Sequence, residues 1–225
     1  MAESERGATQ APSRPIRVLV VDDHEVLASS LAMVLDAEDD LTTAGVATTL
    51  EQARALIGTT EPDVVLLDHR MPDGDGVAAI PGLRAVRPSV GVVVLTASAA
   101  DHVLLAAIEA GASGFLSKTR SLSEVTAAVR AAATGESVIS PELLARLLPR
   151  FGRGKVQAAG ELTDREREVL GLVAEGLSNA AIAERLVVSV HTVRNHIASL
   201  SAKLGAHSKL EALSIALRRG LLPDL

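Results

Sequence analysis

Short apolar segments alternate with amphipathic segments over residues 16–134, and this alternation restricts the possible folds more than any other feature of the sequence. The apolar segments predict strands at 16–21, 42–47, 63–68, 91–96 and 114–117. The amphipathic segments predict helices at 25–36, 50–57, 76–87, 102–110 and 122–134. Strands and helices that alternate in this way form an open parallel sheet with helices on both faces. We therefore predict an α/β domain built as a five-stranded, doubly wound sheet.

Local signals place the ends of these helices. Thr48-x-x-Glu51 and Ser121-x-x-Glu124 have the spacing of capping boxes, which mark helix starts. Glycines that follow an amphipathic segment favour helix ends, here Gly58, Gly111 and Gly135.

The remainder of the chain has a different pattern. A short helix is predicted at 140–149, and residues 150–160, rich in glycine and basic residues, are typical of a linker. Beyond the linker the pattern is helical throughout, with helices predicted at 164–175, 179–186, 190–204 and 209–219. The predicted organisation is a flexible tail (1–15), the α/β domain (16–134), a helix and linker (135–160) and an all-α domain (161–225).

The charge distribution supports two domains with different partners. Residues 1–149 carry 11 Lys and Arg against 20 Asp and Glu (net −9), and residues 150–225 carry 11 against 8 (net +3), which together give −6. The second part is therefore better suited to a polyanion. The absence of cysteine excludes disulfides and thiolate metal sites. No apolar run reaches the roughly 20 residues of a membrane span, and we expect a cytoplasmic protein without a membrane partner.

Polar side chains follow the predicted strands where those strands end. Asp22 and Asp23 follow the first strand, Asp68 ends the third, Thr96 ends the fourth and Lys118 follows the fifth. The carboxyl ends of parallel strands share one edge of a sheet, so we expect these side chains to meet in one crevice. Three clustered carboxylates favour Mg²⁺. A metal, a lysine and a hydroxyl beside an aspartate suit phosphoryl transfer onto a carboxylate.

These segments resemble the receiver domain of two-component response regulators: VLVVDDHEVLASSL, VVLLDHRMPDGDG, VVVLTAS and GASGFLSK. The resemblance implies that a partner histidine kinase phosphorylates Asp68. It implies a Mg²⁺ site formed by Asp22, Asp23, Asp68 and the backbone carbonyl of Arg70. It also implies that Thr96 is the switch hydroxyl, Phe115 the switch aromatic and Lys118 the phosphate-binding lysine. Thr119 follows the lysine where many receivers have proline, so no cis-proline bond is expected.

Helix 190–204 has the pattern expected of a DNA-reading helix. Its apolar residues Val190, Val193, Ile197, Leu200 and Leu204 form one stripe that is predicted to be buried. The opposite face presents His191, Arg194, Asn195 and Ala198. Two helices joined by a turn as short as VVS, with Arg and Asn near the start of the second, fit the major groove of DNA.

The segment LTDREREVLGLVAEGLSNAAIAERLVVSVHTVRNHIASLSAKLG strongly resembles the helix-turn-helix domain of LuxR-type regulators, and the whole chain resembles the NarL/FixJ family. This resemblance directs Arg194, Asn195 and Ala198 toward base edges. It directs Ser189, Thr192 and Lys203 toward phosphates. It implies a transcription regulator that binds promoter DNA and forms a homodimer when phosphorylated or DNA-bound. The leucines of the last helix (Leu210, Leu213 and Leu217) are either core or partly dimer surface.

Other functions are less consistent with the sequence. A phosphatase that forms an aspartyl-phosphate is one alternative, but Asp68 is followed by His69-Arg70, so no second acid stands two residues on. An adaptor whose receiver only binds a partner is another. The nucleotide-binding patterns G-x-G-x-x-G and G-x-x-x-x-G-K-[ST] are absent. We expect no enzymatic activity beyond self-catalysed phosphoryl transfer to Asp68 and its slow hydrolysis. The spacing of His24, His69 and His102 does not predict a metal cluster.

Overall fold

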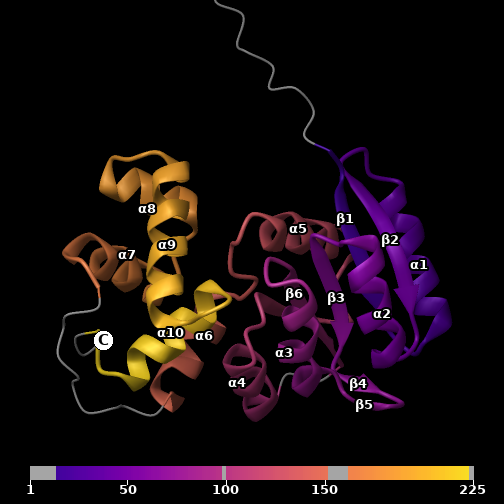
Figure 1. Cartoon of the computed structure of the whole chain (residues 1–225). Helices are drawn as coiled ribbons and strands as arrows, with labels where there is room; N and C mark the ends of the chain where they lie inside the picture. The colour runs from indigo at the N-terminus through magenta and orange to yellow at the C-terminus, as the bar shows by residue number, and fades with distance from the viewer. Residues whose placement is uncertain (1–13, 98–99, 152–161, 223–225) are drawn as a thin grey trace, which may run out of the picture.

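The computed structural model describes residues 14–97, 100–151 and 162–222. Its N-terminal part is a five-stranded sheet in the order β2-β1-β3-β6-β7, with every neighbouring pair parallel (Figure 1). The strands are β1 (Ile16–Val21), β2 (Leu41–Ala47), β3 (Val64–Asp68), β6 (Gly91–Thr96) and β7 (Gly114–Ser117). The helices that connect them are α1 (Glu25–Asp36), α2 (Leu50–Thr60), α3 (Gly76–Val86) and α4 (Asp101–Glu109), with α5 (Leu122–Ala133) after β7. The predicted doubly wound sheet is confirmed.

Side-chain alternation along the strands explains why both faces are covered. In β1, Val18 and Val20 pack with residues of α1 and α5, whereas Leu19 and Val21 pack with residues of α2, α3 and α4. Every residue of β3 and β6 is buried. Strands buried on both faces are expected to be continuously apolar, as these two are until they reach their last residues.

The start and end of α2 differ from the prediction. Thr49, not Thr48, caps the helix by accepting a hydrogen bond from the Gln52 amide, while the Thr48 amide donates to the Gln52 side chain. The helix continues through Gly58 and ends at Thr60. A Cβ at Gly58 would lie 3.6 Å from Val86 of α3. Gly58 therefore sits where two helices pack closely and does not end one.

A short hairpin between β3 and α3 was not predicted. It consists of β4 (Arg70–Met71) and β5 (Gly74–Asp75), which pair antiparallel. Asp73 at the turn of the hairpin accepts hydrogen bonds from the amides of Leu50 (3.0 Å) and Glu51 (3.1 Å). It thus provides acceptors for two amides in the first turn of α2 that have no partner within the helix. Asp75 caps α3 through the amides of Val77 and Ala78. The loop after Asp68 is thereby fixed to two helices.

The C-terminal part is helical. Its helices are α6 (Pro141–Leu147), the 3₁₀ turn η1 (Leu148–Arg150), α7 (Asp164–Ala174), α8 (Asn179–Leu186), α9 (Val190–Leu204) and α10 (Lys209–Arg218). Most of the expected linker, residues 152–160, lies outside the described residues. The predicted stripe of α9 is buried at Val193, Ile197, Leu200 and Leu204, which pack among α7, α8 and α10.

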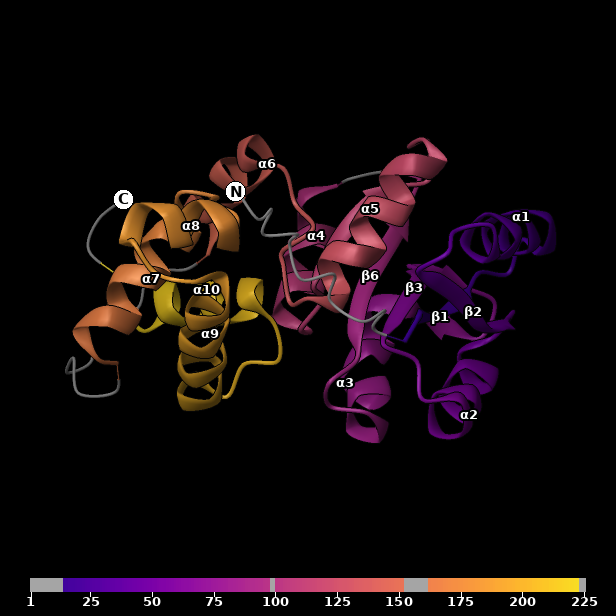
Figure 2. The same ribbon diagram turned by 90° about the horizontal axis from the view of Figure 1, so that it is seen from above.

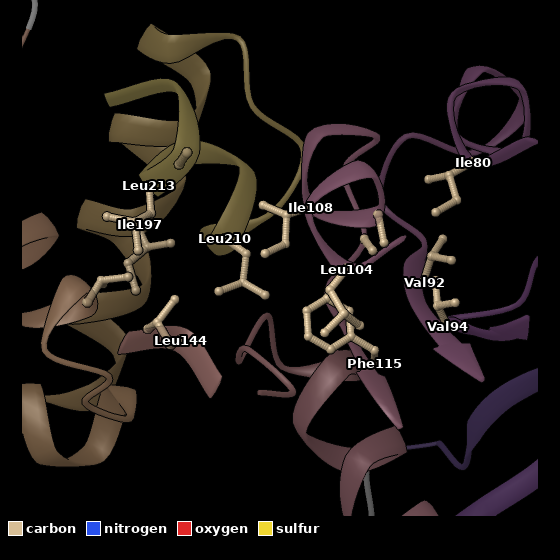
Figure 3. Packing of buried hydrophobic residues seen from close by; sticks show 14 of the residues in the cluster. Ile80, Val92, Val94, Leu104, Ile108, Phe115, Leu144, Ile197, Leu210 and Leu213 are labelled. Atoms are coloured by element: carbon tan, nitrogen blue, oxygen red, sulfur yellow. The ribbon is translucent and has the colours of Figure 1, made fainter. Parts of the chain in front are cut away.

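The two parts of the chain pack against each other. Helix α10 contacts α4, and both views place the C-terminal helices beside the sheet domain (Figures 1 and 2). Figure 3 shows Leu210 of α10 beside Ile108 of α4, and both belong to one continuous cluster of buried apolar side chains. The Arg84 side chain of α3 donates a hydrogen bond to the His207 carbonyl across the boundary (2.9 Å).

Candidate functional sites

Two buried carboxylates and one lysine meet at the carboxyl edge of the sheet. Asp22 follows β1, Asp68 ends β3, and both are almost completely buried. Lys118 Nζ lies 2.6 Å from Asp68 Oδ2 and 2.7 Å from Asp22 Oδ2. Burial acts to lower the pKa of Lys118, but the two carboxylates outweigh it, and the pKa is raised. The lysine therefore remains charged and compensates both acids.

The same cluster has donor atoms that suit a divalent cation. Oxygen or nitrogen atoms of Asp22, Asp23, His24 and Asp68 all lie within 4.8 Å of one another. Asp22 Oδ2 is buried and faces Lys118 Nζ at 2.7 Å. The carboxylates of Asp22, Asp23 and Asp68 form a set of oxygen donors that fits Mg²⁺. The Arg70 amide donates to Asp68 Oδ1 (3.2 Å), which places the Arg70 backbone beside the cluster.

His24 lies closer to the acids than its sequence position suggested. Its Nδ1 is 2.8 Å from Asp23 Oδ1 and 3.3 Å from Asp22 Oδ1. The sequence predicts only a polar loop residue here, because a histidine next to two aspartates can point in any direction. His69 Nδ1 is 3.6 Å from Asp68 Oδ1, and His102 is not part of the acidic group among the residues that the structure describes.

Gly76 supports the backbone of Asp68, a role that the sequence did not reveal. Its amide donates to the His69 carbonyl (2.9 Å), and a Cβ at this position would overlap the Asp68 carbonyl oxygen. Gly76, the last glycine of the segment DGDG, permits α3 to begin directly against the strand end that carries Asp68.

Thr96 and Phe115 lie on neighbouring strands beside the acidic cluster. Thr96 pairs with Ser117 in the sheet register, and its carbonyl accepts a hydrogen bond from the Lys118 amide (2.9 Å). Both side chains are buried, and Phe115 lies beside Leu104 of α4 (Figure 3). Thr96 and Phe115 also line one cavity of about 430 Å³. The aromatic ring therefore has adjacent space that it could enter.

Helix α9 presents the predicted polar face to the surface. Ser189 caps the helix by accepting from the Thr192 amide (3.0 Å). Arg194, Asn195 and Ala198 are exposed. Lys203 is also exposed, but its Nζ lies 2.7 Å from Glu166 Oε2. The structure therefore places Lys203 in an ion pair within the domain.

The exposed face of α9 is turned partly toward the sheet domain. Arg194, Ala198 and Ser201 line one side of a groove of about 310 Å³, and Arg84 and Pro88 lie on the other side. Part of the exposed face of α9 therefore lies opposite the sheet domain.

Comparisons with known proteins identify both parts of the chain. Residues 18–130 match the response regulator receiver domain, and residues 160–216 match the bacterial regulatory proteins of the luxR family. The DNA-binding transcriptional activator DevR/DosR of Mycobacterium tuberculosis is 36% identical over 204 residues, which cover 89% of this chain and 94% of that protein. The transcriptional regulatory protein YdfI of Bacillus subtilis is 36% identical over 208 residues, which cover 92% of this chain and 97% of that protein.

The chain belongs to the two-component response regulators of the NarL/FixJ type.

A solved structure of the RcsB response regulator from Salmonella typhimurium is also similar, with a TM-score of 0.54 and 25% identity over 89% of this chain and 97% of RcsB. The family consists of transcription regulators and not of enzymes in the usual sense, and its receivers accept phosphate from histidine kinases. Over the described residues of this response regulator, every helix is too short or too polar to cross a membrane.

Proposed function

We propose that this response regulator binds promoter DNA under the control of phosphorylation at Asp68 by a partner histidine kinase. The observation that carries the proposal is the position of Lys118, whose ammonium lies between the buried carboxylates of Asp68 and Asp22. An ammonium in this position attracts the negative oxygens of an incoming phosphoryl group. A protein that acts on promoters works in the cytoplasm, which is the location we propose.

In the proposed reaction, a carboxylate oxygen of Asp68 attacks the phosphorus of a phosphohistidine. The new O–P bond forms as the P–N bond breaks, and the bond electrons and a proton pass to the leaving imidazole. Lys118 leaves its ion pair with Asp68 and pairs with a phosphoryl oxygen. Asp22, Asp23, Asp68 and the Arg70 carbonyl would hold Mg²⁺, which supplies further positive charge for the transferred group. The Thr96 hydroxyl then donates to a phosphoryl oxygen, and Phe115 moves toward the position that Thr96 vacates.

The phosphorylation site can be tested by mass spectrometry. After incubation of the protein with acetyl phosphate and Mg²⁺, we expect one hydroxylamine-labile phosphoryl adduct on the intact chain. Asp68→Asn should carry no adduct, since the amide cannot act as the nucleophile, and chelation of Mg²⁺ should abolish labelling. Asp39→Asn, which changes an exposed aspartate away from the pocket, is the matched control. Equal labelling of Asp68→Asn would contradict the assignment, and steady release of phosphate from small phosphomonoesters would favour a phosphatase.

For DNA, we propose that Arg194, Asn195 and Ala198 face the bases. Ser189 and Thr192, at the start of α9, would contact phosphates. Lys203 would contact a phosphate with the ammonium protons that Glu166 does not use, because an ammonium has three donors.

We also propose that the receiver blocks DNA binding before phosphorylation. The support is the groove between α9 and the receiver: Arg194 and Ala198 line one side, and Arg84 and Pro88 of the receiver line the other. Phosphorylation would shift the population toward a form in which α9 is free and the chain dimerises. The net charges of −9 over residues 1–149 and +3 over residues 150–225, a span that includes the basic linker, favour the docked arrangement.

A further inference from the structure

The segment after α5 is attached to the edge of the sheet next to Phe115. The Val138 amide donates to the Ser113 carbonyl (3.0 Å), and the Phe115 amide donates to the Val138 carbonyl (2.9 Å). Gly114 and Val138 form a parallel bridge, and a Cβ at Gly114 would overlap the Val138 carbonyl. This segment therefore extends the sheet by a single bridge, and its position depends on the position of β7.

Two residues before Val138, Glu136 enters the DNA-binding domain. Its Oε1 accepts a hydrogen bond from the Asn179 amide at the start of α8 (2.9 Å). Its Oε2 lies 3.3 Å from Lys209 Nζ at the start of α10. One carboxylate from the receiver side thus contacts the first residues of two helices of the DNA-binding domain.

Lys209 depends on this carboxylate for its counter-charge. The residue is only 5% exposed, and its ammonium also donates to the Leu177 carbonyl (3.1 Å) and to Asn179 Oδ1 (3.0 Å). Both of these acceptors are neutral. Within the described part of the chain, Glu136 is the one acid that forms an ion pair with Lys209. A buried charge that loses its partner is strongly unfavourable, so removal of Glu136 favours arrangements in which Lys209 reaches water.

We propose that Glu136 is the latch through which the phosphorylation state of the receiver controls the docking of the DNA-binding domain. This inference rests on the proposed function above. When Phe115 and β7 shift after phosphorylation, Val138 moves with the strand and withdraws Glu136 from Asn179 and Lys209. The helices α8 and α10 then separate from the receiver, and the face of α9 that lines the groove becomes accessible to DNA.

A second ion pair across the same boundary provides a matched control. Arg218 Nη1 of α10 lies 2.6 Å from Glu109 Oε1 of α4, and the two side chains are 39% and 51% exposed. Exposed pairs contribute little to stability. Glu109→Gln and Glu136→Gln therefore make the same chemical change at the same boundary, one in an exposed ion pair and one at the partner of the buried Lys209. The glutamine at position 136 can still accept from the Asn179 amide, so this variant removes chiefly the charge.

The test uses the full-length unphosphorylated protein and a DNA fragment selected by the phosphorylated wild type from a random library. We expect Glu136→Gln to raise DNA affinity about tenfold, the size of effect that a lost charged contact has on an equilibrium. Glu109→Gln should change the affinity by about twofold or less. Glu136→Ala, which also removes the hydrogen bond to Asn179, should have a larger effect than Glu136→Gln. Equal affinities for wild type and Glu136→Gln would overturn the latch.

Hydrogen exchange at the Asn179 amide gives an independent readout. We expect this amide to exchange faster in Glu136→Gln, in Glu136→Ala and in phosphorylated wild type than in unphosphorylated wild type. Unchanged protection after phosphorylation, together with tighter DNA binding, would refute the latch and leave the proposed function intact. If phosphorylated wild type binds DNA no better than the unphosphorylated form, the proposed function fails. In that case the exchange rate of the Asn179 amide in the two Glu136 variants still decides whether Glu136 holds the domains together.

Discussion

Single residues set the chemistry of the acidic pocket. Lys118 pairs with both Asp68 and Asp22, so its single positive charge offsets part of their negative charge. The same contact limits metal binding, because a cation at Asp22 must share a carboxylate with Lys118. The pocket is thus held together by charges that the proposed phosphorylation would rearrange.

Arg194 is expected to read DNA sequence. Its exposed guanidinium can donate two hydrogen bonds to a guanine, which provides about 1–3 kcal/mol of discrimination. Arg194→Ala should therefore lower affinity for the target more than for random DNA. Lys203→Ala should weaken both alike and reduce the slope of log K against log salt by roughly 0.9. Fluorescence anisotropy over a salt series on both DNAs measures this difference. Equal weakening of the two DNAs by Arg194→Ala would identify Arg194 as a phosphate contact.

Val187 is the strained residue of the helix-turn-helix. It follows α8 with φ 53° and ψ 48°, a left-handed conformation that a β-branched residue rarely adopts, and its side chain is 90% exposed. Val187→Gly should raise the free energy of unfolding by about 1 kcal/mol, because the strain is lost and little packing is removed. Val187→Ala keeps a Cβ, so its free energy of unfolding should rise less than that of Val187→Gly. Urea unfolding followed by circular dichroism compares them, and a Val187→Gly variant less stable than wild type would show that the valine makes a stabilising contact.

At the scale of secondary structure elements, one carboxylate connects two helices of the DNA-binding domain. Glu166 of α7 completes the capping box with Thr163, and it also accepts from Ser199 (2.7 Å) and Lys203 (2.7 Å) of α9. Burial acts to raise the pKa of Glu166, but the hydrogen bonds from Lys203, Ser199 and Thr163 outweigh burial and lower it to about 2. The orientation of α9 therefore depends on a charged, buried acid.

This arrangement predicts a specific dependence of stability on pH. A carboxyl whose pKa is lower in the folded state contributes stability that is fully present above its unfolded pKa of about 4.3. The contribution, roughly 2–3 kcal/mol, is lost as the pH falls from there toward 2. Glu166→Gln should therefore be less stable than wild type at neutral pH, and the difference should shrink below pH 4. Thermal unfolding of both proteins from pH 7 to pH 2.5 measures this difference in stability, and Glu168→Gln, at an exposed glutamate, is the control. A constant difference would exclude ionisation of Glu166 as the cause.

At the scale of the whole molecule, the receiver and the DNA-binding domain share one apolar core. Leu144 of α6, Ile108 of α4 and Leu210 of α10 belong to the same buried cluster (Figure 3). Leu210 of α10 is buried beside Ile108 of the receiver, whereas Leu213 is buried beside Ile197 of α9 and Leu217 is only partly buried (Figure 3). Use of the Leu210 side of α10 for dimerisation therefore requires the domains to separate.

Removal of the receiver tests this arrangement directly. A fragment without residues 1–155 lacks the wall of the groove opposite α9 and should bind the target DNA more tightly than the full unphosphorylated chain. Gel-shift titrations at matched dimer concentration compare the two proteins, and phosphorylated full-length protein is the positive control. If the fragment binds no better than the unphosphorylated chain, the receiver does not inhibit DNA binding.

The sequence by itself determined the fold class, the acidic pocket and the helix-turn-helix. Parallel strands bring their carboxyl ends to one edge, so Asp22, Asp68, Thr96 and Lys118 could be placed together from strand pattern alone. The stripe of α9 could likewise be assigned from helical periodicity. These features depend on local patterns that recur at fixed spacing.

The spacing Thr163-x-x-Glu166 predicts the capping box of α7, which the structure confirms. Only the tertiary structure decided the roles of Gly58, Gly76 and Glu136 and the contacts of Glu166 with α9. Gly58 has the sequence signature of a helix end, but close packing of α2 against α3 places it inside a helix. Glu136 is partly buried and Glu166 is buried, and each contacts residues more than 30 positions away in the chain. A side chain's burial and its charge partners depend on which distant segments pack against it, and short-range sequence patterns carry no information about that packing.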